Sequence, residues 1–260
     1  MLVGDIEVIP LSDGECLMPP GYFPNADWSA HQALLDADGI MRLPIGCFLV
    51  RTGDQTVLID AGLGPRDLEW LVGGKLPAEL AAQGMAPADI DVVVCTHLHL
   101  DHAGWLVEGG VPSFPNATVR FGAGDWQHWV EEAHPKDRIR QAMLLLDQQH
   151  RLEPIDGDGV AIAPGITARA APGHTMGHHV LVVSSGADRL LLLGDAVACP
   201  VQLEEEDWQA MSDMDPGLAR RTRDSLWAEL EGTETHFTAA HFPDLQFGRV
   251  LRGQGKRYFS

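Results

Sequence analysis

The feature that most constrains this chain is the stretch of residues 96–102, which reads THLHLDH and places three imidazoles and one carboxylate within six positions. Imidazole and carboxylate groups are the usual protein ligands of a divalent cation such as zinc. Protonated histidines this close together would repel one another, so the cluster makes sense as neutral ligands directed at a metal ion. The preceding apolar run, residues 91–95, predicts a short buried strand. The cluster is therefore expected on a loop at the end of a strand, where a rigid scaffold can position it.

The spacing His-x-His-x-Asp-His resembles the signature of the metallo-β-lactamase superfamily. Three later segments match the other motifs of that family in the same order: residues 172–178 read PGHTMGH, residues 190–195 read LLLLGD, and residues 239–243 read AAHFP. The resemblance runs from about residue 46 to His241, which is most of the chain. One motif alone would be a weak signal, but four in the family's order make a specific match.

The resemblance implies two adjacent metal sites that share one carboxylate. The first metal ion would be held by His97, His99 and His174, the second by Asp101, His102 and His241, and both by a bridging Asp195. Paired hydrolytic metals lie about 3.5–4 Å apart, and a shared carboxylate offsets part of their repulsion. Because these ligands offer nitrogen or oxygen and no thiolate, two zinc ions are expected, while iron, manganese and cobalt also suit the set. Asp60 and His178 are expected to orient ligands.

The predicted elements agree with a fold of the α+β class. Apolar, β-rich runs occur at residues 44–51, 56–60, 90–95, 117–121, 166–170, 179–184, 189–193 and 235–240, and helical patterns at 124–132, 135–146 and 216–231. With the resemblance, this order implies a four-layer αβ/βα sandwich, two mixed sheets face to face between outer helices. We find no linker and expect a single domain over residues 1–260. Residues 12–40 predict an irregular arm, either a cover over the metal loops or an ordinary surface excursion.

The net charge of the chain limits the kinds of molecule that it is expected to bind. The formal net charge of −19 disfavours nucleic acid and anionic membranes, because both need basic patches on the protein. No signal peptide or membrane-spanning run is visible, and the four cysteines are far apart, so we expect reduced core thiols in a cytoplasmic protein. The expected partner is a small neutral molecule, and a homo-oligomer is compatible with the sequence.

The resemblance implies metal-assisted hydrolysis, in which a metal-bridging hydroxide attacks the substrate and Asp101 and Asp195 are the catalytic carboxylates. It also separates branches of the family. True β-lactamases lack the bridging Asp, glyoxalase II carries a longer region than the 19 residues that follow His241, and the tRNA-processing branch needs a basic arm. The remaining match is to the branch of lactonases, aryl esterases and methyl parathion hydrolase-like enzymes. It implies a neutral, apolar lactone or aryl ester as substrate, with phosphotriesters as side substrates.

Other functions stay open at this point. Acyl-homoserine lactonases of the family use a tyrosine in the middle of the chain, whereas the tyrosines here are Tyr22 and Tyr258. A quorum-signal lactonase is therefore an alternative, as is a thioester or β-lactam hydrolase of the same fold. Alternatives of another class are a mononuclear-iron persulfide-type dioxygenase, which would keep fewer ligands, and a non-catalytic sensor. If an aromatic ring lines the pocket, the expected candidates are Trp28, Trp105, Trp126 and Trp129.

Overall fold

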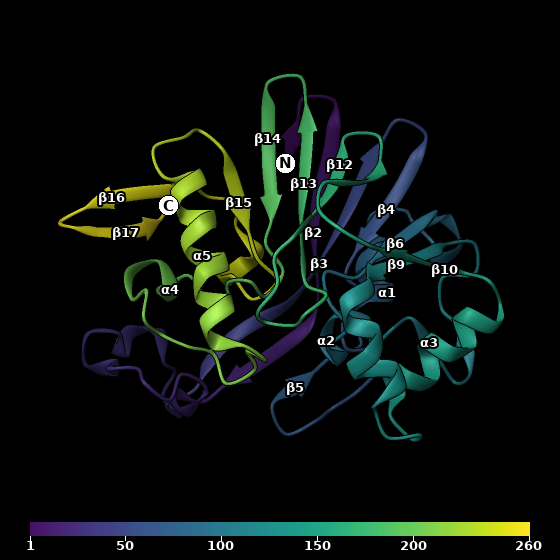
Figure 1. Cartoon of the computed structure of the whole chain (residues 1–260), viewed down its shortest axis with the longest axis horizontal. Helices are drawn as coiled ribbons and strands as arrows, with labels where there is room; N and C mark the ends of the chain where they lie inside the picture. Colours follow the sequence, from purple (N-terminus) through teal and green to yellow (C-terminus); the bar gives the residue numbers. More distant parts are fainter.

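The computed structural model describes residues 1–260, and two mixed β-sheets form its centre (Figure 1). The larger, eight-stranded sheet runs in the order β1-β2-β3-β4-β6-β9-β10, with β5 paired to β2. Its strands are β1 (Leu2–Val3), β2 (Ile6–Met18), β3 (Met41–Thr52), β4 (Gln55–Ile59), β5 (Leu71–Val72), β6 (Val92–Val94), β9 (Thr118–Gly122) and β10 (Leu152–Ile155). The second sheet runs β11-β12-β13-β14-β15 and comprises β11 (Val160–Ala163), β12 (Ile166–Ala170), β13 (His179–Ser185), β14 (Asp188–Leu192) and β15 (His236–Thr238).

The two sheets pack face to face because their strands are apolar on both sides. In β3, Cys47 belongs to the apolar cluster under the helices of the first half of the chain, whereas the next residue, Phe48, belongs to the cluster between the sheets. In β14, Leu190 reaches the same inner cluster, and Leu191 packs on the opposite face. Successive side chains of a strand point to opposite faces, so a strand covered on both faces reads as a continuous apolar run.

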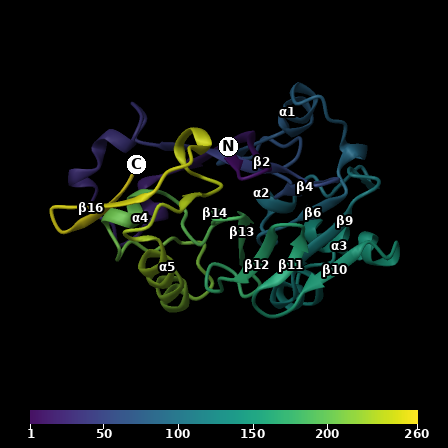
Figure 2. The ribbon, with the colours of Figure 1, turned by 90° about the horizontal axis from the view of Figure 1, so that it is seen from above.

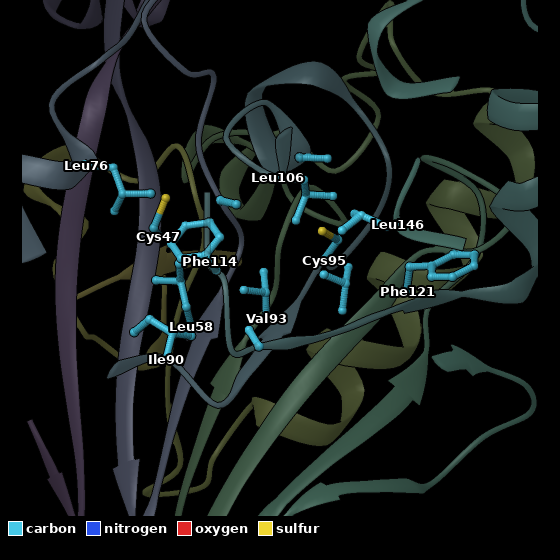
Figure 3. Close-up of a cluster of buried hydrophobic side chains, with 14 of the residues drawn as sticks. Cys47, Leu58, Leu76, Ile90, Val93, Cys95, Leu106, Phe114, Phe121 and Leu146 are labelled. Carbon is cyan, nitrogen blue, oxygen red and sulfur yellow. The ribbon is translucent and has the colours of Figure 1, made fainter. Parts of the chain in front are cut away.

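One layer of helices covers each outer face. The helices α1 (Leu76–Ala82), α2 (Leu100–Ala103) and α3 (Arg138–Gln148) contribute side chains to the cluster on the larger sheet, to which Leu76 and Leu146 belong together with Leu58 and Val93 of the strands (Figure 3). On the other side, α5 (Pro216–Leu230) packs Leu226 and other apolar residues against the second sheet. From above, α3 and α5 lie at opposite sides of the molecule (Figure 2). The order helix, sheet, sheet, helix is the predicted αβ/βα sandwich.

The remaining elements are short. Two small hairpins pair β7 (Val107–Glu108) with β8 (Val111–Pro112) and β16 (Val250–Gly253) with β17 (Lys256–Phe259), and α4 (Val201–Glu204) is one turn long. The helix predicted from residue 216 is confirmed, since the Asp215 carboxylate accepts a hydrogen bond from the Leu218 amide at 2.9 Å and Pro216 begins the helix. None of the helices combines the length and the apolar character that crossing a bilayer requires.

The irregular arm predicted for residues 12–40 begins later than expected. Strand β2 continues to Met18, paired with β3 from Glu7 opposite Arg51 to Met18 opposite Met41, with a register shift between residues 12 and 14. A bulge of this kind lets a strand bend and continue. The glycine-containing sequence suggested that the strand ends there, so the continuation of β2 was not predicted. A Cβ on Gly14 would lie 1.8 Å from the Val72 carbonyl oxygen, so glycine is needed there for close contact with β5. From residue 19 the arm consists of 3-10 turns at Pro20–Tyr22, Trp28–Ala30 and Gln32–Leu34.

The helix predicted at residues 124–132 is also wrong in detail. A 3-10 turn at Ala123–Asp125 is followed by a π-helix at Gln127–Glu131. The wider π-turn is rare in helices and is often found at functional sites. Local periodicity did not predict it, because the segment is fixed by what Asp125 and Trp129 contact in the rest of the fold.

Candidate metal centre

The predicted ligands lie just beyond the ends of neighbouring strands. Strands β4, β6 and β9 are parallel, as are β14 and β15. Asp60 follows β4, His97 follows β6, Asp195 follows β14, and His241 follows β15. The carboxyl ends of parallel strands meet at one edge of a sheet, so strand order brings Asp60 close to His97 in the first sheet and Asp195 close to His241 in the second. His174 lies in the turn that joins β12 to β13.

All seven predicted ligands converge, and they do so as two groups. In each group the candidate ligand atoms lie within 4.8 Å of one another; the groups are His97, His99, His174 and Asp195, and Asp101, His102 and His241. The Asp195 carboxylate lies between them. Its Oδ2 is 3.4 Å from His174 Nε2, and its Oδ1 is 3.4 Å from His102 Nε2 and 3.5 Å from His241 Nε2. One carboxylate therefore faces both groups, as a bridging ligand must.

The outer ring nitrogens of four histidines are each held by an oxygen atom. The pairs are His97 Nδ1 with Thr96 Oγ1 at 3.1 Å, His102 Nδ1 with Asp60 Oδ2 at 2.9 Å, His174 Nδ1 with Asp213 Oδ1 at 3.1 Å, and His241 Nδ1 with the Pro44 carbonyl at 2.7 Å. A neutral imidazole has one N–H and one lone pair. When Nδ1 donates to an oxygen, the lone pair of Nε2 is directed at the centre, which is how metal-binding histidines are oriented.

The nitrogen and oxygen atoms at the centre are arranged to bind divalent cations and do not satisfy one another by hydrogen bonds. His99 Nδ1 lies 2.8 Å from His97 Nε2 and 3.0 Å from His174 Nε2, so three ring nitrogens face the same point. His102 Nε2 and Asp195 Oδ1 are buried and have no hydrogen-bond partner. Buried polar atoms without partners are costly, and a bound cation would satisfy them. The donor set, imidazole nitrogens and carboxylate oxygens, suits zinc and related divalent metals.

Electrostatics differ between the two groups. Burial, with help from neighbouring imidazoles, lowers the pKa of His97 well below its usual value and lowers the pKa of His99 to about 3. Burial also acts to lower the pKa of His102, but the Asp195, Asp60 and Asp101 carboxylates outweigh it and leave that pKa well above its usual value. His97 and His99 are therefore neutral ligands, whereas His102 is ion-paired and would exchange its proton for a cation.

The two residues expected to orient ligands do so. The Asp60 carboxylate accepts hydrogen bonds from the Thr96 amide at 2.7 Å and from His102 Nδ1 at 2.9 Å. Asp60 has a φ of +60°, which is uncommon for a residue other than glycine and marks a constrained position. The Asp195 amide donates to His178 Nε2 at 3.0 Å. Asp60 thus fixes the backbone just before His97, and His178 fixes the backbone at Asp195.

Three supporting residues were missed from the sequence. Asp213 pairs with His174 and also accepts a hydrogen bond from the buried Arg223 guanidinium at 3.3 Å. Asp125 accepts from the amides of Leu98 and Gly177. Asp125 could have been found by its place, because it follows β9, which lies parallel beside the strand that leads to His97. Nothing local signals Asp213, which reaches His174 only through the fold.

A cavity of about 540 Å³ opens above the two groups. His99, Asp101, Asp195 and His241 line its floor, and its apolar walls include Leu17, Met18, Tyr22, Trp70, Leu71 and Met211. The arm expected as a possible cover therefore supplies part of the wall. None of the four tryptophans expected in the pocket lines it. Trp105 donates to the buried Asp13 carboxylate at 2.9 Å, and the Trp126 ring lies 5.8 Å from that of Phe121, so both serve packing.

With this geometry established, comparison with known proteins identifies the family. The model of the metallo-beta-lactamase superfamily matches residues 41–231. The chain belongs to the metallo-β-lactamase superfamily. An N-acyl homoserine lactonase of Bacillus thuringiensis is 25% identical over 237 residues, covering 84% of this chain and 85% of that protein.

Two solved structures extend the likeness to the fold. AidC, described as a dizinc quorum-quenching lactonase, superposes with a TM-score of 0.89 at 22% identity, covering 100% of this chain and 95% of its own. The hydrolase AbOPH superposes with a TM-score of 0.87 at 25% identity, covering 100% and 94%. Both candidate ligand groups are complete in this chain, and its fold matches these two hydrolases over its whole length.

We expect the purified protein to bind two divalent ions per chain, because the two groups converge on separate points joined by Asp195. His241→Ala removes a ligand of the second group only, so it should lower the stoichiometry towards one. Elemental analysis after expression with added zinc measures this directly. His236→Ala, in strand β15 and outside both groups, is the matched control and should keep two ions. A wild-type stoichiometry of one that His241→Ala leaves unchanged would contradict the two-site arrangement.

Proposed function

We propose that the protein hydrolyses a neutral, apolar lactone or aryl ester with two zinc ions held by the seven converging side chains. The observation that carries this proposal is the position of Asp195, between two ligand groups at the floor of a largely apolar cavity. Such a cavity favours a substrate without charge. The relatives named as N-acyl homoserine lactonases support lactones, and acyl-homoserine lactones belong to this substrate class. Phosphotriesters remain side substrates in this proposal.

Bound zinc would supply a water of lowered pKa and a Lewis acid for the carbonyl oxygen. The chain's own contribution begins with Asp101, which lines the cavity and takes up the proton of the attacking water. Burial acts to raise the pKa of Asp101, but His102 and His241 outweigh burial and lower it, so the carboxylate is ionised. The apolar walls keep competing water away from the ester, and the fixed histidines avoid reorganisation during the reaction.

Tyr22 adds a hydrogen-bond donor at the cavity wall. Its hydroxyl lies 2.6 Å from Ser212 Oγ, and its ring is held against that of Phe23. Burial, reinforced by the Asp195 charge, raises the pKa of Tyr22 well above its usual value, so the phenol keeps its proton. A neutral phenol in the wall can donate to the substrate carbonyl. In this proposal, Tyr22 of the N-terminal arm takes the place of the tyrosine that acyl-homoserine lactonases of the family have in the middle of the chain.

A panel of substrates tests the proposal: acyl-homoserine lactones, an aliphatic lactone, an aryl ester, a phosphotriester, a β-lactam and a thioester. We expect the highest kcat/KM for lactones or aryl esters, and none after metal removal. Asp60→Ala should lower kcat/KM by about 10–100-fold, as is typical of residues that orient ligands. Asp195→Ala should lower it further, because both ligand groups lose a shared partner.

A thioester or β-lactam as the preferred substrate, or equal and small losses from the two variants, would argue for a different function. Zinc stoichiometry of each variant separates loss of metal from loss of chemistry.

Tyr22→Phe removes the proposed donor and keeps the ring. We expect kcat/KM for the preferred ester to fall by about 3–10-fold, the range of one hydrogen bond, with zinc content unchanged. Tyr258→Phe is the matched control, because Tyr258 lies in the hairpin strand β17 and not in the cavity wall. Steady-state kinetics on both variants measure the effect. An equal response of the two tyrosines would remove Tyr22 from the site.

A further inference from the structure

Asp125 is a buried carboxylate for which the proposed reaction has no use. It follows β9 in a 3-10 turn, and its relative exposure is 1%. Burial raises the pKa of Asp125, although hydrogen bonds to its carboxylate act against that shift. Burying an acidic group is costly unless several donors satisfy it. A fold that keeps Asp125 buried must therefore gain something from the donors that it holds.

Those donors come from two separate loops that carry metal ligands. Asp125 Oδ2 accepts from the Leu98 amide at 3.0 Å and from Thr175 Oγ1 at 3.0 Å, and Oδ1 accepts from the Gly177 amide at 2.7 Å. Leu98 lies between His97 and His99, and Thr175 follows His174. The donors Leu98 and Thr175 are thus next in sequence to the three histidines of the first ligand group. One side chain thus connects the loops that supply all three of them.

The loops pack so closely that no larger residue can replace the glycines between them. A Cβ placed on Gly122 would lie 1.8 Å from the Gly177 carbonyl oxygen, and one on Gly177 would lie 2.5 Å from the Asp125 amide nitrogen. The backbones therefore meet directly at these glycines. A carboxylate can accept several hydrogen bonds, whereas an amide side chain of the same shape offers one acceptor and turns a donor towards another donor. Three donors at this point specify an aspartate.

The second ligand group has its own support, which does not involve Asp125. Asp60 accepts from His102 Nδ1, and the Pro44 carbonyl accepts from His241 Nδ1. Asp125 forms no hydrogen bond with Asp101, His102, His241 or Asp195. Asp60 also holds Thr96 beside His97 and so supports both groups, whereas the hydrogen bonds of Asp125 reach only the loops of the first group.

We propose that Asp125 is a positioning residue that sets the spacing of His97, His99 and His174, and thereby the affinity and geometry of the first metal site alone. This inference rests on the proposed pair of metal sites. It adds to that proposal the statement that the two sites can be perturbed separately, through residues that touch neither metal nor substrate.

The test uses two single-site backgrounds of the full chain. His241→Ala disables the second site and leaves the first, and His174→Ala does the reverse. Asp125→Asn is introduced into each, and zinc affinity is measured by competition with a chromophoric chelator. We expect a loss of roughly 10–100-fold in the first background, the range for residues that hold ligands, and no change in the second. In the protein with both sites filled by cobalt, the visible spectrum should change in only one of its two sets of bands.

Thr175→Val removes one of the three hydrogen bonds at constant side-chain shape. It keeps the inference testable if Asp125→Asn does not fold. It should produce a smaller change in the same direction. Asp60→Asn is the matched control and should weaken both sites, because Asp60 bonds to His102 and also to Thr96 beside His97. Equal losses from Asp125→Asn in both backgrounds, or no loss in either, would overturn the inference while the wild type still binds two ions. A wild type that binds no metal would instead overturn the proposed function and this inference together.

Discussion

The structure depends on the convergence of seven polar side chains on one centre at the floor of the cavity. Imidazoles and carboxylates that are packed so closely either repel or compete for hydrogen bonds unless each one is fixed. The fold fixes them from outside: Asp60, Asp213, Thr96 and the Pro44 carbonyl each hold the outer nitrogen of one histidine. The inner ring nitrogens therefore face the centre, and the shared carboxylate of Asp195 lies between the two groups. The centre is thus organised before any cation binds.

The sandwich is what makes this convergence possible. The first sheet delivers His97, His99, Asp101 and His102 from the end of β6, and the second sheet delivers Asp195 and His241 from the ends of β14 and β15. Residues of both sheets form one apolar cluster between them, which locks the two halves at a fixed distance. A shift between the sheets would separate the halves of the metal centre. Apolar packing between the sheets therefore stabilises the relative positions of the ligand residues.

Above the metal centre, the walls of the cavity come from parts of the chain that carry no metal ligand. The arm contributes Tyr22, the loop before β5 contributes Trp70, and the segment before α5 contributes Met211. The arm is tied to that last segment by the Tyr22–Ser212 contact and by the hydrogen bond from the Met211 amide to the Tyr22 carbonyl at 2.9 Å. Since Ser212 precedes Asp213, the wall and the support of His174 share one stretch of backbone. The cavity wall and one support of the metal centre are therefore adjacent in the structure, although Tyr22 is far from Asp213 in sequence.

The sequence by itself determined the family, the sandwich and the convergence of the seven ligand residues, because short motifs at strand ends encode them locally. It also identified Asp60 and His178, whose places follow from the same motifs. The tertiary structure decided which aromatic residues line the cavity, where the arm begins, and that Asp125 and Asp213 support the centre. Trp126 and Trp70 look alike in sequence, yet one packs on Phe121 and the other borders the cavity. Such differences depend on contacts between residues distant along the chain, and no local pattern of residues records those contacts.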